Sequence, residues 1–233
     1  MLVPFAAPCV EARFVSRHKR FTVLVERAGE RFAAHTNNTG SMLGLLRPGA
    51  RVLLSVSDNP ARKLKHTLEM VELDGFWVGV NTSAPLRLLQ AAFRAGRLPG
   101  ARGYANFRRE VACGDSRLDA LLEGPGGRLW VECKNVTLVE DGGVAQFPDA
   151  VTERGRKHLY ALARAREAGD RAALFFCVQR GDAACFGPAW AVDPAYGEAL
   201  QEVLDKGVEL WAYRALVTPR GLDLGPRLAL ARG

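Results

Sequence analysis

The sequence predicts an α/β (α+β) protein, in which a small β-barrel precedes a larger domain that has a mixed sheet and flanking helices. Two observations support this prediction. Residues 9–82 contain several short apolar runs, each bounded by turn residues. After residue 106, strand-like runs alternate with helical segments, which is typical of a sheet covered by helices. We place the boundary after residue 82, which gives domains at residues 1–82 and 83–233.

Composition limits the class of protein. A chain of 233 residues with 48% hydrophobic and 24% charged residues is ordinary for a packed soluble protein, and this argues against disorder. Lys and Arg total 32 and Asp and Glu total 25, so the formal net charge is +7. Such a balance favours a polyanionic partner such as nucleic acid.

The cysteines and the N-terminus bear on the compartment. The five cysteines have neither C-x-x-C nor zinc-finger spacing, and residues 1–5 do not resemble a secretory signal. We therefore expect a reducing, cytoplasmic environment. No apolar run approaches the roughly 18 residues that span a bilayer, so we expect no membrane partner. Walker-type and G-x-S-x-G motifs are absent, which argues against NTPases and serine hydrolases.

Strand-like runs dominate the first eighty residues. They lie at residues 12–15, 21–25, 51–56, 67–73 and 76–80. Several short strands of this kind suggest a small barrel, and an OB-like barrel fits the basic loops between them. These loops predict a surface that follows nucleic-acid phosphates. Its predicted members are Arg17, Lys19, Arg20, Asn37, Asn38, Arg62, Lys63 and Lys65.

The second domain begins with a helix. Ser83 precedes an apolar run with proline in its first turn, and Gly96 marks the end of that run. Residues 97–100 then form a connection, and the glycines of residues 139–143 predict a mobile loop at the rim of the site. The remaining elements are helices at residues 152–168 and 195–206, and strands at 107–113, 116–123, 128–135, 172–178, 208–217 and 222–230.

The predicted strands at residues 116–123 and 128–135 carry the residues that point to chemistry. Alternate side chains of a strand face opposite ways, so Glu132 and Lys134 share one face and Cys133 lies on the other. Pairing of the two strands brings Asp119 near Glu132. Two carboxylates beside an ammonium group form a plausible site for a hard cation and the phosphate oxygen that it polarises.

A third carboxylate is expected nearby. The two-residue turn at residues 114–115 predicts a hairpin in which Cys113 pairs with Ser116, and therefore Glu110 with Asp119. Two acids in direct opposition repel each other unless a cation or a proton relieves them. Glu110 is thus a candidate accessory metal ligand. Neutralisation of Glu110 by Arg109 or Arg117 is the alternative.

Asp119, Glu132 and Lys134 together resemble the core of PD-(D/E)XK nucleases, with Leu118 in place of the proline before the first acid. A wider resemblance covers nearly the whole chain. The blocks at residues 35–42, 59–67, 77–82, 131–138 and 147–159 resemble, in the same order, the sugar fermentation stimulation protein (SfsA) family. The resemblance implies a bacterial or archaeal DNA-binding protein with an OB-like N-terminal domain and a nuclease-like C-terminal domain.

The resemblance and the strand register together give an expected role for each site residue. Asp119 and Glu132 would hold Mg²⁺ or Mn²⁺, with the main-chain carbonyl of Cys133 and Glu110 as further ligands. Lys134 would orient the attacking water or stabilise charge on the phosphorus. On the helix at residues 152–168, the predicted phosphate-binding residues are Arg154 and Lys157. Several nuclease-like families carry a Gln-x-x-x-Tyr pair on this helix, and this chain has Arg156 and Tyr160 at that spacing.

Two functions remain open at this level, and both have DNA as the partner, single- or double-stranded, bound through mostly sequence-independent contacts. The first is a metal-dependent phosphodiesterase that cuts DNA. The second is a transcriptional regulator of sugar-metabolism genes that binds DNA without cutting it. A third function, carbohydrate handling, is suggested by the family name alone. No cluster of aromatic residues and carboxylates in the sequence would build a sugar subsite.

Overall fold

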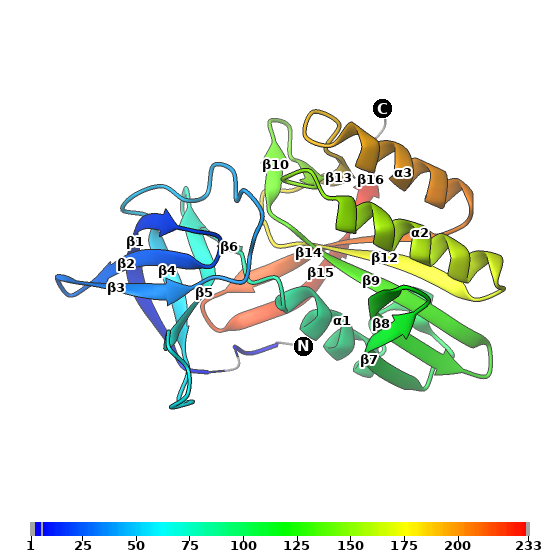
Figure 1. Cartoon of the computed structure of the whole chain (residues 1–233), viewed down its shortest axis with the longest axis horizontal. Coiled ribbons are helices and arrows are strands. Elements are labelled where there is room, and N and C mark those ends of the chain that lie inside the picture. The colour runs from blue at the N-terminus through cyan, green and yellow to red at the C-terminus, as the bar shows by residue number, and fades with distance from the viewer. Residues whose placement is uncertain (1–2, 6, 232–233) are drawn as a thin grey trace.

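The structure is a computed structural model that describes residues 3–5 and 7–231, and it consists of a small β-barrel beside a larger α/β domain (Figure 1). The barrel sheet has the strand order β3-β2-β1-β4-β5-β6. A parallel bridge between His35 and Thr67 joins β3 to β5 and closes the sheet, so the predicted barrel is confirmed. Its strands are β1 (Cys9–His18), β2 (Thr22–Arg27), β3 (Glu30–His35), β4 (Arg51–Val56), β5 (His66–Leu73) and β6 (Phe76–Gly79).

The second domain is built on a mixed sheet, as predicted, with the order β15-β14-β12-β9-β8-β7. Strands β9, β12 and β14 run parallel to one another, and β8, β7 and β15 pair antiparallel at the two sides. The bounds are β7 (Asn106–Cys113), β8 (Ser116–Gly124), β9 (Gly127–Val136), β12 (Arg171–Val178), β14 (Glu209–Thr218) and β15 (Gly221–Arg227).

Helices cover both faces of this sheet (Figure 1). Helix α1 (Ala84–Arg94) lies on one face, and α2 (Glu153–Glu167) and α3 (Pro194–Asp205) lie on the other. Strand β12 supplies both cores, because its alternate side chains point to opposite faces. Phe176 packs in the core under α2 and α3, and Phe175 packs in the core under α1. A strand buried on both faces reads as a continuous apolar run, which explains the sequence of β12.

Capping side chains set two of the helix starts. Thr152 accepts a hydrogen bond from Gly155 N at the start of α2, and Asp193 accepts one from Tyr196 N at the start of α3. Ser83 stands at the predicted start of α1, but it makes no capping hydrogen bond. Its hydroxyl donates to Asn81 Oδ1 instead, at 2.7 Å, and so ties the helix start to the end of the barrel.

The predicted mobile loop at residues 139–143 is wrong. This segment belongs to a hairpin of β10 (Leu138–Glu140) and β11 (Val144–Phe147), and its glycines form the turn. Strand β11 continues into a small sheet with β13 (Cys185–Pro188) and β16 (Ala229–Leu230). The predicted last strand at residues 222–230 is consequently divided between β15 and β16. The connection after α1 contains a short 3₁₀ turn, η1 (Pro99–Ala101).

The two domains touch through loops and through the start of the chain. Met42 N donates to Asp149 Oδ2 at 2.9 Å, and a Cβ at Gly40 would lie 2.4 Å from Asp149 Oδ1. Val3 bridges to Leu222 and packs in the core under α1, so this residue lies against the second domain. Apart from this N-terminal contact, we propose that the boundary between the two domains follows residue 82. Among the described residues, no helix has both the length and the apolar character needed to cross a bilayer.

The Met42–Asp149 hydrogen bond allows a test of the domain contact. Asp149→Ala removes the acceptor, so we expect the Met42 amide to exchange with solvent about fivefold faster, in line with the roughly 1 kcal/mol of one hydrogen bond. Asp149→Asn keeps an acceptor oxygen and should preserve the protection. Hydrogen exchange followed by NMR measures both variants. Unchanged Met42 protection in Asp149→Ala, with Val131 of β9 as reference, would show that the contact is not formed.

Candidate functional site

Glu132 and Lys134 of β9 lie on the same face of the sheet, as strand alternation predicts. Lys134 Nζ is 2.7 Å from Glu132 Oε1. The side chains are 11% and 4% exposed for Lys134 and Glu132, respectively, so this ion pair is largely removed from water. Its charges are therefore screened little and interact strongly.

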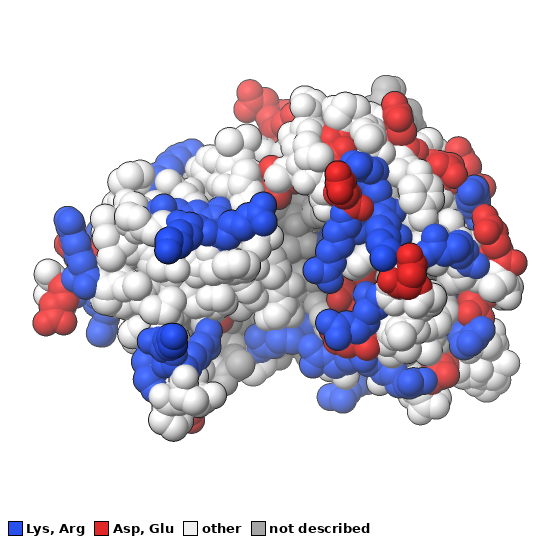
Figure 2. Space-filling model, viewed as in Figure 1, with Lys and Arg blue, Asp and Glu red and all other residues white. Residues whose placement is uncertain are grey.

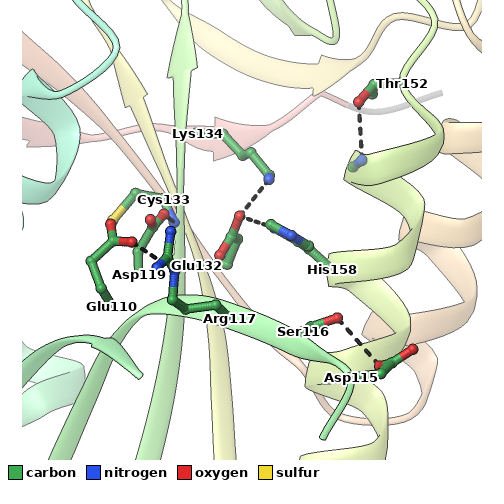
Figure 3. Close-up of polar contacts among 11 residues, drawn as sticks. Glu110, Asp115, Ser116, Arg117, Asp119, Glu132, Cys133, Lys134, Thr152 and His158 are labelled. Carbon is green, nitrogen blue, oxygen red and sulfur yellow. Dashed lines mark hydrogen bonds and ion pairs between the residues drawn. The ribbon is translucent and has the colours of Figure 1, made fainter. Parts of the chain in front are cut away.

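His158 of α2 completes this cluster, and sequence reasoning did not identify it as a site residue. Its Nδ1 is in hydrogen-bond contact with Glu132 Oε1, the oxygen that Lys134 also contacts (Figure 3). Because a carboxylate only accepts, Nδ1 carries the proton. His158 directly precedes Leu159 and lies four residues before Leu162, both of which face the sheet. The helical period of α2 therefore carried a signal for its inward position.

Asp119 of β8 lies at the edge of β9, where its side chain contacts the main chain of that strand. The pairing of β8 with β9 extends only to Ala120 and Val131. Beyond that point the Cys133 N–H donates to Asp119 Oδ2 at 2.8 Å, so a carboxylate occupies the place of a strand carbonyl (Figure 3). Cys133 is half-buried and packs against the core under α1, and the loss of water around its thiol raises its pKa well above the ordinary value.

The two carboxylates have pKa values that are shifted in opposite directions. Burial and the charge of Glu132 raise the pKa of Asp119 to about 6. Burial also acts to raise the pKa of Glu132, but the charges and hydrogen bonds of Lys134 and His158 outweigh it and lower that pKa to about 2. Glu132 is therefore the fixed negative charge of the site. Asp119 is the carboxylate that gains a proton first as the pH falls.

Free acceptor atoms on these carboxylates fit a divalent cation. Glu132 Oε2 is buried and has no hydrogen-bond partner in the described part of the chain. A buried carboxylate oxygen without a partner is unfavourable unless something binds it. The residues described include no cluster of three or more His, Cys, Asp and Glu side chains arranged for a metal. A cation here would thus depend on Asp119, Glu132 and main-chain oxygen.

Glu110 does not pair with Asp119 in the ladder as predicted, but it lies close enough for its charge to add to the raised pKa of Asp119. The predicted register holds on both sides, with Arg109 opposite Ala120 and Val111 opposite Leu118. Glu110 itself has a positive φ of 53°, a conformation that takes it out of the regular ladder. Its carboxylate pairs with Arg117 Nε at 3.1 Å. The predicted alternative, neutralisation by an arginine, describes this contact, and Glu110 is not among the ligands that we propose.

Cavities open on two sides of the Glu132 cluster. One, of about 290 Å³, lies between the domains and is lined by Lys134 and Asn135 of β9 and by Arg20 of the barrel. Another, of about 550 Å³, is lined by Arg154, Lys157 and His158 of α2 and by the β7–β8 turn. Figure 2 shows a hollow between the domains with Lys and Arg on both sides, and further Lys and Arg over α2.

The residues of the predicted phosphate-binding surface fall into two groups. Lys19, Arg20 and Lys63 are exposed, as is Lys65, whose Nζ donates to Asn59 O. Arg62 is half-buried. Arg17, Asn37 and Asn38 instead use their polar groups within the protein. Arg17 donates to Gly40 O and Asn38 O, Asn38 donates to Val80 O, and Asn37 donates to Asn81. We assign these three residues to holding the loop at residues 36–41.

Arg156 and Tyr160 point away from the site. Arg156 pairs with Asp193 at 3.3 Å, and the Tyr160 hydroxyl donates to Glu202 at 3.2 Å. Both contacts fasten α2 to α3. The side chain of α2 that lies beside Glu132 is that of His158.

Comparison with known proteins covers both domains. The SfsA N-terminal OB domain model matches residues 15–80, and the sugar fermentation stimulation protein RE domain model matches residues 83–221. Sugar fermentation stimulation protein homologues from Syntrophobacter fumaroxidans and Maridesulfovibrio salexigens are each 54% identical, over 97% and 99% of this chain and 87% and 97% of theirs. The structure of Pyrococcus furiosus SfsA in complex with Ca²⁺ is similar with a TM-score of 0.91, at 26% identity over 99% of both chains.

The opposite pKa shifts predict opposite effects of neutralising the two carboxylates. A raised pKa means that Asp119 favours folding when protonated, fully below pH 3.8, and that this contribution is lost as the pH rises through 6. Above pH 7 the ionised group opposes folding by up to about 3 kcal/mol. Asp119→Asn should therefore raise the unfolding temperature at pH 8 and change it little at pH 4.

Glu132→Gln should have the opposite effect on the unfolding temperature at pH 8. The lowered pKa of Glu132 gives a stabilisation that is complete above pH 4.5 and lost as the pH falls towards 2. Glu132→Gln removes the negative charge that Lys134 and His158 stabilise, so the unfolding temperature should fall at pH 8. Thermal unfolding in EDTA measures both variants. If both substitutions lower the unfolding temperature at pH 8, the assignment of raised and lowered pKa values is wrong.

Proposed function

The chain belongs to the sugar fermentation stimulation protein family, and from that premise we propose that it binds DNA and cleaves it as a metal-dependent phosphodiesterase. One observation carries the proposal. Glu132 is a buried carboxylate with one oxygen held by Lys134 and His158 and with the other oxygen unpartnered, close enough to Asp119 to raise its pKa. An acid pair with shifted pKa values beside a lysine is a typical functional arrangement.

A divalent cation fits the free acceptors of this pair. We propose that Asp119 and Glu132, with the main-chain carbonyl of Cys133, hold Mg²⁺ or Mn²⁺, which prefer oxygen ligands. The similar Pyrococcus furiosus protein was solved in complex with Ca²⁺, another hard cation, and this supports the choice. A divalent cation supplies an activated water and neutralises charge on the phosphate.

Lys134 is the proposed catalytic lysine. Its ammonium group borders the cavity between the domains, where it can donate to a phosphate oxygen or to the attacking water. Glu132 holds Lys134 in place, and His158 in turn fixes the orientation of Glu132. His158 is therefore a positioning residue.

Basic residues outside this cluster are proposed to neutralise neighbouring phosphates. Arg154 and Lys157 line the cavity on the α2 side. Arg20 lines the same cavity as Lys134 although it comes from the barrel. A DNA strand that passes between the domains would contact Arg20 on the barrel side and Arg154 and Lys157 on the α2 side. Lys19, Lys63 and Lys65 would extend its contacts over the barrel.

Cleavage of single- and double-stranded DNA in Mg²⁺, Mn²⁺ or EDTA tests the activity. Cutting should require the metal, and Lys134→Ala should reduce its rate by about 10²-fold or more while binding in EDTA persists. Lys206→Ala on α3 removes the same charge at a distant, exposed ion pair and should cut like the parent. If the parent binds DNA but does not cut it with either metal, the regulator without nuclease activity is the correct function.

The salt dependence of binding tests the barrel surface. Lys63→Glu with Lys65→Glu should weaken binding to unrelated sequences about equally, because phosphate contacts carry no sequence information. The slope of log affinity against log salt should shrink by about 0.7–0.9 for each phosphate that the variant no longer neutralises. Lys206→Glu with Arg102→Glu makes the same change in charge on the second domain. An equal effect of both double variants would mean that the barrel lysines make no local contact.

A further inference from the structure

A second polar cavity lies on the barrel. It has a volume of about 360 Å³, within the range of small-molecule sites, and it shares no lining residue with the cavity that contains Lys134. Strands β3, β4 and β5, the β4–β5 loop and the start of α1 surround it. Its side chains include His35, Ser55, Arg62, Glu69, Asn81 and Arg87.

Glu69 of β5 is a buried carboxylate in the wall of this cavity. It is 6% exposed, and within the described residues no basic side chain forms an ion pair with it. Its Oε1 accepts from the Ser55 hydroxyl at 2.6 Å, and its Oε2 accepts from Asn81 Nδ2 at 2.7 Å. Each carboxylate oxygen accepts two hydrogen bonds, so one acceptor position stays available on each. Burying a carboxylate without a cation is unfavourable, and N–H donors from a ligand would offset this.

Arginines complement this acidic group at the cavity. Arg62 donates to Thr67 Oγ1 at 2.7 Å, and Arg87 contacts the Pro4 carbonyl, which leaves further N–H groups on both guanidinium groups. Arginine is the preferred partner of phosphate. An aromatic surface extends outward from His35 of the cavity wall, because the ring of Phe21, 52% exposed, stacks on His35 with ring centroids 6.3 Å apart and an interplanar angle of 13°. Unpaired bases stack on such side chains.

We propose that this cavity binds one unpaired nucleotide, with the N–H edge of the base on Glu69 and a phosphate on Arg62 and Arg87. Guanine matches best, since its ring N–H and its amino group lie side by side and can meet the two oxygens of a carboxylate. The proposal rests on the DNA binding proposed above and adds selection of a base to contacts that otherwise follow phosphates. A free nucleotide offers the same chemistry as a nucleotide within a strand.

Binding in EDTA, where cleavage does not contribute, tests the cavity. The probes are labelled thymidine 12-mers with no substitution, with one central deoxyguanosine, or with one central deoxyinosine, which lacks the amino group. We expect the guanine strand to bind about fivefold or more tightly than the thymidine strand, with deoxyinosine between them. Equal affinity of the three strands would overturn the proposal and leave general DNA binding intact. The inosine comparison requires no change in the protein.

Substitutions locate the preference. Glu69→Gln should abolish the preference for guanine while the thymidine strand binds as before, and Arg62→Ala should weaken binding of the guanine strand. Arg102→Ala, an exposed arginine that does not line the cavity, is the matched control and should change neither. A guanine preference that survives Glu69→Gln places the selection elsewhere and contradicts the proposal.

Competition separates the two sources of the nucleotide. If deoxyguanosine monophosphate removes the guanine preference and leaves the thymidine strand bound, the cavity accepts free nucleotides. If it has no effect while the preference depends on Glu69, the cavity accepts a nucleotide only as part of a strand. Both results support the cavity as a nucleotide site. Loss of cleavage in Lys134→Ala is a separate readout, so failure of the cavity and failure of the nuclease activity are distinguishable.

Discussion

The buried charge of Glu132 is the constraint on which the second domain depends. A carboxylate this far from water is stable only with compensating donors, and here they come from Lys134 on the same strand and His158 on α2. The first contact requires regular alternation along β9. The second contact requires that α2 turn one particular face towards the sheet. The same face buries Leu159 and Leu162 against the sheet. Electrostatics and apolar packing therefore select the same orientation of the helix.

The site also depends on the contact between the domains. The cavity beside Lys134 has walls from both domains, and the barrel side includes Arg20 and the loop at residues 36–41, which Arg17 and Asn38 hold in place. Asp149 receives the Met42 N–H of the segment that follows. Asn37 and Asn38, which the sequence predicted to bind DNA, make side-chain hydrogen bonds within the protein that hold this loop. A polar side chain in a connection between strands can satisfy main-chain groups of the protein itself instead of binding a ligand.

Local periodicity was sufficient to predict the elements and part of the site. The alternation of β9 placed Glu132 with Lys134, and the short turn at residues 114–115 set the register of β7 and β8. Periodicity did not reveal that Asp119 replaces a strand carbonyl, because this follows from where the pairing of β8 with β9 ends. Nor did it reveal the positive φ of Glu110 on β7, where the ladder with β8 is interrupted. The hairpin of β10 and β11 was missed because its stability comes from pairing with β13, which is distant in the sequence. His158 was missed because its partner lies on another element.

The position of Val3 has a consequence for synthesis on the ribosome. Val3 is synthesised long before its strand partner, Leu222, which comes far later in the sequence. At typical translation rates the interval between them is on the order of ten seconds or more. The barrel, whose strands are neighbours in the sequence, can form during that time, whereas Val3 must wait for its partner. The core under α1 therefore cannot close until Leu222 has been synthesised, and a nascent chain halted before that residue would still expose this apolar surface to chaperones.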